Sequence, residues 1–206
     1  MRKRILLLFM MLAAMYAIGQ SSDKEYFKKN YIKEVMNRAA KWQIAHPKHV
    51  QNDWTNGAYY AGMFAAWQTT KSPIIYKAMM DMGEDSTHWR PYRRWYHADD
   101  IAISQTYIDL YRIEKNRKMI QPTIDTVKKF IANPYPTKGI EVVKWWWCDA
   151  LFMAPPTLVK LGATLKDPTY FQYNDEYFKE TYNLLYDKEE RLFARDLGYV
   201  IKNDGK

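Results

Sequence analysis

The stretch Trp145-Trp-Trp-Cys-Asp149-Ala-Leu-Phe-Met-Ala-Pro-Pro156 opens a helix that the sequence predicts over residues 148–165 and that is apolar on nearly every side. A helix without a polar face has to be covered by neighbours all around it. Pro155 and Pro156 are expected to kink this helix or to mark a helix start. The sequence therefore predicts an α-helical protein in which some helices lie inside others.

Two classes of helix alternate on either side of this stretch. The helices predicted at 56–69, 97–112 and 148–165 are apolar on most sides, and those predicted at 24–46, 72–85, 121–133 and 167–187 each show one polar face. Residues 191–200 are predicted to form a short β-hairpin with Leu197-Gly198 as its turn. A toroid of helical hairpins, in which outer helices wrap inner ones, explains the alternation, and a helical solenoid is the alternative.

Acidic and aromatic residues gather at the starts of the three apolar helices. Asp53-Trp54-Thr-Asn56 precedes the first, His97-Ala-Asp99-Asp100 opens the second, and the three indoles with Asp149 open the third. In a toroid the inner helices run parallel, so these starts would meet at one mouth of the central cavity. A solenoid gives no reason for this coincidence, and the sequence therefore favours the all-α toroid.

Aromatic residues make up 16% of the chain, with 17 Tyr and 8 Trp, which fits a surface that binds carbohydrate. The three consecutive indoles are expected to surround the carboxyl group of Asp149 and to hold it protonated, which suits proton donation. The alternative is that the indoles belong to the core and that Asp149 caps its helix as an anion. Basic residues do not alternate with aromatics in one patch, which argues against a nucleic-acid partner.

Residues 1–20 have the pattern of an export signal. Met1-Arg-Lys-Arg4 is basic, residues 5–14 are apolar, and Ala17-Ile-Gly19 offers small residues before a cleavage point. We therefore expect residues 1–19 to be a signal peptide, the protein to be periplasmic or extracellular, and no stable membrane association after cleavage. An uncleaved membrane anchor is the alternative. Cys148 is the only cysteine in the sequence, so no intrachain disulfide can form.

Carboxylates at separate helix starts suggest general acid and base chemistry on a glycoside. Asp99 and Asp100 are adjacent, so on a helix one can face a pocket while the other caps. His97 either binds a substrate carboxylate as a cation or caps its helix. The sequence has no Cys/His metal spacing, no phosphate-binding glycine loop and no Gly-x-Ser-x-Gly elbow, so neither a metal nor a cofactor is expected.

Three strings of the sequence match one enzyme family. They are His97-Ala-Asp-Asp-Ile-Ala-Ile-Ser-Gln-Thr-Tyr107, Trp147-Cys-Asp-Ala-Leu-Phe-Met-Ala-Pro-Pro156 and Asp53-Trp-Thr-Asn-Gly57. The second string is the most specific. The chain, from about residue 26 onward, resembles the unsaturated glycuronyl hydrolases of glycoside hydrolase family 105, which include the unsaturated rhamnogalacturonyl hydrolases.

This resemblance implies an (α/α)6 barrel that acts on the 4,5-unsaturated uronic acid, such as a pectic galacturonyl group, at the non-reducing end of lyase products. In this family an aspartic acid protonates the C4=C5 vinyl ether and helps to deliver water to C5, and the hemiketal then opens and expels the remaining sugar chain. The resemblance implies that Asp149 is the acid/base residue and that the second carboxylate is one of the pair Asp99 and Asp100. Asp100 is favoured because it starts the apolar run Ile101-Ala-Ile103. The substrate contacts that it implies are Asp99, His97, Trp54, Asn56, Trp146, Trp147 and Met153.

A barrel of six helical hairpins has about twelve helices, whereas the 206 residues here predict about seven. We therefore expect residues 20–206 to be the N-terminal part of a catalytic domain, an incomplete (α/α)6 barrel with a short C-terminal hairpin. A truncated non-catalytic remnant, or a helical carbohydrate-binding protein, is the alternative.

Overall fold

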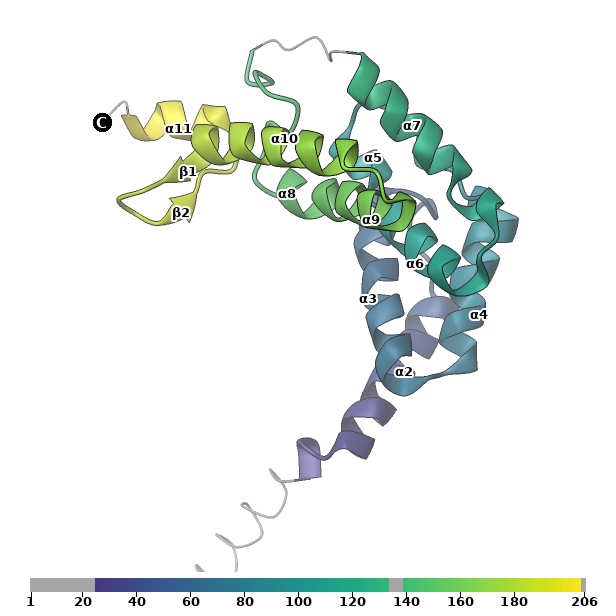
Figure 1. The fold of residues 1–206 in the computed structure, drawn as a ribbon. Helices are drawn as coiled ribbons and strands as arrows, with labels where there is room; N and C mark the ends of the chain where they lie inside the picture. Colours follow the sequence, from purple (N-terminus) through teal and green to yellow (C-terminus); the bar gives the residue numbers. More distant parts are fainter. Residues whose placement is uncertain (1–24, 134–138, 205–206) are drawn as a thin grey trace, which may run out of the picture.

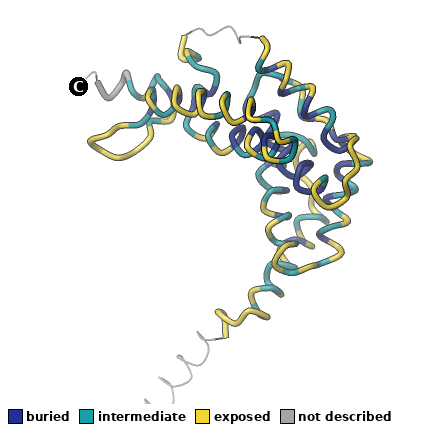
Figure 2. The backbone as a smooth tube through the Cα atoms, viewed as in Figure 1, coloured by how far each residue is buried: buried dark blue, intermediate teal, exposed yellow. Residues whose placement is uncertain are grey.

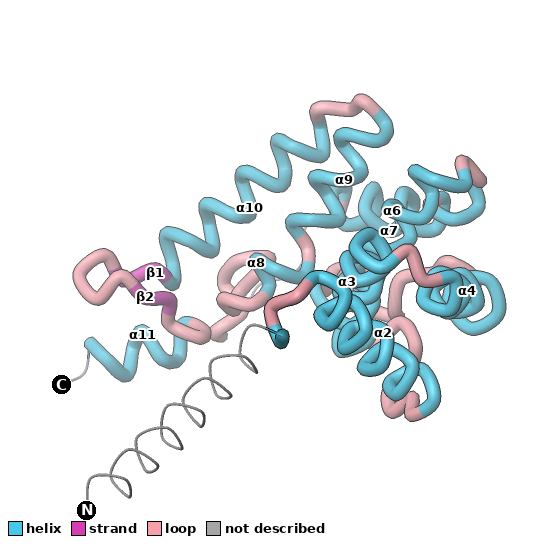
Figure 3. The backbone as a smooth tube through the Cα atoms, turned by 90° about the horizontal axis from the view of Figure 1, so that it is seen from below, coloured by secondary structure: helices cyan, strands magenta, loops and turns pink. Residues whose placement is uncertain are grey.

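The helices follow one another along an open arc in the computed structural model, which describes residues 25–133 and 139–204 (Figure 1). In chain order the elements are α2 (Lys29–Ala45), α3 (Trp54–Thr70), α4 (Pro73–Asp81), the π-helix η1 (Met82–Thr87), α5 (Ala98–Ile101), α6 (Ser104–Glu114), the 3-10 turn η2 (Arg117–Met119), α7 (Gln121–Ala132), α8 (Ala150–Met153), α9 (Pro155–Leu165), α10 (Thr169–Leu185), β1 (Tyr186–Asp187), β2 (Leu192–Phe193) and α11 (Leu197–Asp204). α2 lies against α3 and α4, and α10 lies along α9 (Figure 3). The mostly helical architecture expected from the sequence is confirmed.

Two of the predicted inner helices are broken close to their starts. The helix predicted at 97–112 divides into α5 and α6 at Ala102 and Ile103. The helix predicted at 148–165 divides into α8 and α9 at Ala154, immediately before Pro155. A proline ring clashes with the turn that precedes it and supplies no N–H, which explains the second break. The acidic residues singled out in the sequence therefore belong to the short helices α5 and α8.

The core is centred on α6, where every residue from Ser104 to Leu110 is buried (Figure 2). This all-round burial matches the expectation for an inner helix. α3 is less enclosed than predicted, because its buried residues are Gly57, Tyr60 and Met63 on one side. A Cβ atom on Gly57 would lie 2.9 Å from the Cβ atom of Ala102, so glycine allows α3 to approach the α5–α6 junction closely.

Each of the long inner helices ends in a lysine with a left-handed backbone. Lys71 after α3, Lys115 after α6 and Lys166 after α9 have φ values of 58°, 59° and 56°. In each case the lysine N–H donates a hydrogen bond to the carbonyl oxygen four residues earlier. This is the left-handed helix cap that glycine usually supplies. We call these three residues the lysine corners, because the chain reverses direction after each of them.

The C-terminal hairpin is present, but its strands differ from those predicted. β1 pairs with β2 in antiparallel register, with Tyr186 opposite Phe193 and Asp187 opposite Leu192. Leu197-Gly198, expected as the turn, instead begins α11. Asp196 explains this difference, because its Oδ1 atom accepts a hydrogen bond from the Gly198 N–H at 2.9 Å and so caps the first turn of a helix.

Residues 1–19, the predicted signal peptide, lie outside the described residues. Among the helices of the described part, none is long and apolar enough to cross a membrane.

Candidate active site

A pocket of about 490 Å³ lies beside the starts of α5 and α8. It is lined by Arg94, His97, Asp99, Trp146, Trp147, Asp149 and Arg195. Two backbone contacts bring the C-terminal segment to α8: the Cys148 N–H donates to the Arg195 carbonyl oxygen at 2.9 Å, and Trp147 forms a β-bridge with Asp196. The structure thus brings together the second and third helix starts singled out in the sequence.

Asp100 does not line this pocket. The residue is 1% exposed, and its carboxylate accepts hydrogen bonds from the Arg94 backbone N–H at 2.5 Å and from Arg94 Nη2 at 2.6 Å. Consecutive residues of a helix project about 100° apart, so Asp99 faces the pocket while Asp100 is held by Arg94. The geometry therefore favours Asp99 over Asp100 as the second carboxylate, and Asp100 has the position of a residue that orients Arg94.

The environment of Asp99 favours its protonated form. Burial raises the pKa of Asp99 to about 6, and the negative charges of Asp149, Asp100 and Asp53 act in the same direction. Arg94 opposes this shift, with its Nη2 atom 3.9 Å from Asp99 Oδ2. A carboxyl group with such a pKa can both hold and release a proton near neutral pH.

His97 is neutral at physiological pH. Burial and the positive charge of Arg94 lower the pKa of His97 to about 4. Its Nδ1 atom accepts a hydrogen bond from the Asp99 N–H at 3.4 Å, and its ring lies 4.6 Å from the ring of Trp147 between centroids. Of the two roles considered from the sequence, this geometry supports the helix cap, and the positive charge of the pocket comes from other residues.

The three indoles divide between core and pocket. Trp145 is fully buried, and its ring packs edge-on against Tyr177 at 5.5 Å between centroids. Trp146 and Trp147 line the pocket, with their rings 4.6 Å apart. Asp149 is exposed and its side chain makes no capping hydrogen bond. The expectation that indoles would enclose Asp149 is therefore wrong for the described structure, and its carboxylate is open to a ligand.

Three other residues predicted to contact substrate lie outside this pocket. Trp54 is 45% exposed at the start of α3, and Met153 is buried in the core. Asn56 lines a different pocket and donates hydrogen bonds to the carbonyl oxygens of His49 and Val50. Asp53, at the first helix start, is close enough for its charge to raise the pKa of Asp99, but this helix start contributes no wall to the pocket.

Sequence reasoning missed the two arginines of the pocket, Arg94 and Arg195. No motif marks either residue, and the only signal is that Arg94 lies three positions before His97. Hydrogen bonds to Asp100 and Asp196, respectively, raise the pKa of each guanidinium above its usual value. Both therefore stay charged, and guanidinium groups are well suited to bind a carboxylate. The pocket combines cations, carboxylates and indole faces, which fits an acidic sugar.

A protein-family model described as Glycosyl Hydrolase Family 88 matches residues 25–205. The chain belongs to this family. The resemblance to unsaturated glycuronyl hydrolases seen in the sequence is thereby confirmed. The similar solved structures include a glycosyl hydrolase of family 88 and a possible member of family 105.

Two curated relatives carry the same name, unsaturated 3S-rhamnoglycuronyl hydrolase. The protein from Formosa agariphila is 38% identical over 186 residues, which cover 85% of this chain and 49% of the relative. The protein from an Alteromonas species is 26% identical over 196 residues, which cover 81% of this chain and 48% of the relative. The chain therefore spans about half the length of the curated relatives that it matches.

Solved structures show the same fold. A family 88 glycosyl hydrolase from Bacteroides vulgatus superposes with a TM-score of 0.74 at 22% identity, covering 84% of this chain and 52% of that one. A possible family 105 member from Salmonella enterica superposes with a TM-score of 0.68 at 17% identity, covering 82% of this chain and 52% of that one. The described helices thus correspond to about half of a helical toroid.

Proposed function

We propose that the protein hydrolyses oligosaccharides that end in a 4,5-unsaturated uronic acid, by hydration of the C4=C5 double bond. The observation that supports this most directly is the presence of Asp99 and Asp149 in one pocket with Arg94 and Arg195. An enzyme for this reaction needs cations that hold the uronate and a carboxyl group that supplies a proton.

Each wall of the pocket has a role in this proposal. Arg94 and Arg195 bind the uronate carboxylate, and the faces of Trp146 and Trp147 stack on the sugar ring. Asp149, which matches the acid/base position of the family string, adds a proton to C4 and helps to deliver water to C5. The hemiketal that forms at C5 then opens and releases the remaining sugar chain.

Asp99 is the second carboxylate in this mechanism. Because its pKa is raised to about 6, it can share a proton with the reacting groups near neutral pH. The buried carboxylate of Asp100 keeps Arg94 in place beside it. This assignment replaces the expectation that Asp100 itself reacts.

The names of the curated relatives guide the choice of substrate. Both are called unsaturated 3S-rhamnoglycuronyl hydrolase. We therefore propose an unsaturated glycuronyl group linked to rhamnose as the substrate, ahead of the pectic galacturonyl group suggested by the sequence alone. Export to the periplasm or the extracellular medium, where lyase products are found, is part of the same proposal.

The test is a spectroscopic assay with the full chain. The C4=C5 double bond absorbs ultraviolet light, so its hydration removes that absorbance. We expect decay with lyase digests that carry a uronyl–rhamnose end, and slower decay with pectic digests. If neither digest loses absorbance, the chain by itself is not this hydrolase. Sugar binding without decay would support the alternative of a non-catalytic carbohydrate-binding protein.

A further inference from the structure

The two arginines of the candidate active site differ in how many N–H donors they leave for a ligand. Arg94 uses one whole edge of its guanidinium, because Nε and Nη2 donate hydrogen bonds to Asp100 at 3.1 and 2.6 Å. Arg195 donates from Nε alone, to Asp196 Oδ2 at 2.9 Å, and its two Nη groups make no hydrogen bond to any described residue. The Arg195 side chain is also 67% exposed, against 38% for Arg94. Arg195 therefore presents the edge that can hold a carboxylate with two parallel hydrogen bonds.

The Asp196 carboxylate is a fixed partner for this guanidinium. Asp196 is 3% exposed, and its other oxygen, Oδ1, accepts a hydrogen bond from the Gly198 N–H at 2.9 Å. A Cβ atom on Gly198 would lie 3.0 Å from that oxygen, so the glycine leaves room for the carboxylate. The backbone of Asp196 is tied to the segment before α8 by its β-bridge to Trp147. The carboxylate is therefore placed by contacts other than the one with Arg195.

Tyr199, in the first turn of α11, contacts the same guanidinium. The centre of its ring lies 5.2 Å from Arg195 Cζ, which is within the range of a cation–π contact. An ion pair on the surface usually holds neither partner, because water screens the charges and both side chains move. The pair of Arg195 with Asp196 differs, because Asp196 is buried and bonded to the backbone. The contact therefore restricts the exposed arginine.

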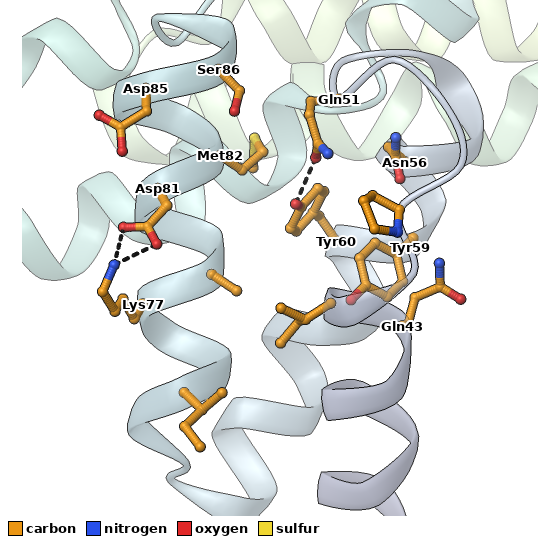
Figure 4. A pocket seen from close by; sticks show the side chains of 14 residues that line it. Gln43, Gln51, Asn56, Tyr59, Tyr60, Lys77, Asp81, Met82, Asp85 and Ser86 are labelled. Carbon is orange, nitrogen blue, oxygen red and sulfur yellow. Dashed lines mark hydrogen bonds and ion pairs between the residues drawn. The ribbon is translucent and has the colours of Figure 1, made fainter.

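A second pocket, of about 380 Å³, lacks such a cation (Figure 4). Residues of α2, α3, α4 and η1 line it, and it shares none of them with the candidate active site. Its one basic residue, Lys77, donates to both carboxylate oxygens of Asp81, at 2.8 and 2.5 Å, and Asp85 adds a further acid. A uronate there would meet an excess of negative charge. Of these two pockets only the candidate active site contains arginine, so binding of an acidic sugar reports on that site.

We propose that Asp196 is a positioning residue, which holds Arg195 so that its Nη edge binds the carboxylate of an acidic sugar in the candidate active site. The identity of the ligand comes from the proposed function. Asp196 acts through Arg195, because both of its own oxygens are already bonded. Fixing a long side chain before the ligand arrives lowers the entropic cost of binding, which corresponds to about two- to tenfold in affinity.

The first measurement follows the Nε–H signal of Arg195 by NMR and needs no ligand. The signal is assigned by its loss in Arg195→Lys. Asp196→Asn is expected to shift it and to speed its exchange with water, because an amide offers one acceptor oxygen in place of two and the Gly198 N–H competes for it. Gly198→Ala, which keeps the charge of Asp196 but crowds its Oδ1 atom, tests the same contact if Asp196→Asn does not fold. Asp187→Asn is the matched control, because Asp187 also accepts from two backbone N–H groups but pairs with no arginine among the described residues.

The second measurement is the dissociation constant of the full chain for glucuronate, with methyl glucoside as the neutral comparison. Arg195→Ala is expected to weaken glucuronate binding about tenfold or more, because it removes charged donors. Asp196→Asn is expected to weaken it about two- to tenfold and to leave the binding of methyl glucoside unchanged. Because Asp196 acts through Arg195, the double variant should bind glucuronate no more weakly than Arg195→Ala alone. Lys77→Ala removes a cation from the second pocket and should have no effect.

The role of Asp196 and the proposed function fail in different ways. An unchanged Nε–H signal in Asp196→Asn overturns the role of Asp196, and so does a loss of binding that multiplies with the loss caused by Arg195→Ala. If the wild type does not bind glucuronate, Arg195 does not hold an acidic sugar and the proposal is overturned, whatever the hydrolysis assay shows. If glucuronate binds with the expected pattern but no lyase digest loses absorbance, the proposed function fails and the role of Asp196 stands.

Discussion

At the scale of single residues, Asp99 and His97 lie side by side at the start of α5, yet burial shifts their pKa values in opposite directions. The pKa of Asp99 is raised from 3.8 to about 6, and that of His97 is lowered from 6.5 to about 4. In both cases the neutral form is the one that the enclosed position prefers. Both groups are therefore largely neutral only between about pH 4 and 6.

These shifts predict opposing effects of pH on stability. Between about pH 4 and 6 the folded protein holds a proton on Asp99 that the unfolded chain releases, so this group lowers the free energy of unfolding as pH rises. Over a similar pH range the unfolded chain holds a proton on His97 that the folded protein lacks. His97 therefore raises the free energy of unfolding as pH rises. As pH rises from 4 to 6, the free energy of unfolding of Asp99→Asn should therefore increase more than that of the wild type. That of His97→Asn should increase less than that of the wild type.

Urea unfolding at several pH values measures both effects. Asp175→Asn, at an exposed position of α10, is the matched control and should follow the wild-type profile. Parallel profiles for all the proteins would show that neither group titrates as the structure indicates.

The catalytic assignment predicts a separation of activity from folding. If the full chain removes ultraviolet absorbance from a lyase digest, Asp149→Asn should slow the decay by about 10²–10⁴-fold, the usual contribution of a general acid or base. Asp149 is exposed and caps nothing, so the far-ultraviolet circular dichroism and the melting temperature should barely change. Full activity in the folded variant would move the chemistry to Asp99.

Sequence reasoning located the carboxylates but could not divide their roles. The string from His97 to Asp100 marks a helix start, yet the choice between Asp99 and Asp100 depends on Arg94, whose side chain holds Asp100 inside. That contact depends on the path of the loop between η1 and α5, which has no local pattern. Arg195 was missed for the same reason, because only tertiary pairing with Cys148 brings it to the pocket.

At the scale of secondary structure, helix propensity alone does not predict the lysine corners. Left-handed backbone costs a residue with a Cβ atom about 1–2 kcal/mol relative to glycine. Lys115→Gly and Lys166→Gly should therefore each raise the free energy of unfolding by about 0.5–1 kcal/mol, after allowance for the greater freedom of glycine in the unfolded chain. Lys71 is less suitable, because its Nζ atom lies 4.5 Å from the centre of the Trp67 ring.

Chemical denaturation measures this gain. Lys128→Gly, in the exposed middle of α7, is the control and should lower the free energy of unfolding by about 1 kcal/mol. If Lys115→Gly and Lys166→Gly lower the free energy of unfolding as the control does, the left-handed backbone at these lysines is not strained as we infer.

Helix periodicity predicted most elements to within a few residues, whereas the interruptions were harder to place. Pro155 made the start of α9 foreseeable, but nothing at Ala102 and Ile103 marks the break between α5 and α6. The C-terminal error had a similar origin. Leu197-Gly198 has the composition of a turn, and the cap from Asp196 turns it into a helix start.

At the scale of the whole molecule, an apolar groove of about 600 Å³ runs between α2 and α3. Its lining includes Met36, Ala39, Trp42, Gly62 and Met63. Exposed apolar surface of this kind binds hydrophobic dyes. We expect the full chain to increase the fluorescence of such a dye, and Gly62→Glu to remove most of the increase, because it places a charge inside the groove.

The same variant should not destabilise the protein. A Cβ atom on Gly62 meets no atom within 4 Å, and glutamate favours a helix more than glycine does. Ala163→Glu on the exposed side of α9 is the matched control and should leave dye fluorescence unchanged. Unchanged fluorescence in Gly62→Glu would place the dye elsewhere.

The contact between Cys148 and Arg195 also sets an order of events during synthesis. A ribosome makes the chain from its N-terminus, and folding of the early part can begin before the rest emerges. The walls that carry Arg94, His97 and Asp99 are made first, those around Asp149 follow, and Arg195 arrives last. A nascent chain therefore has no complete candidate active site until the segment before α11 has left the ribosome and docked on α8.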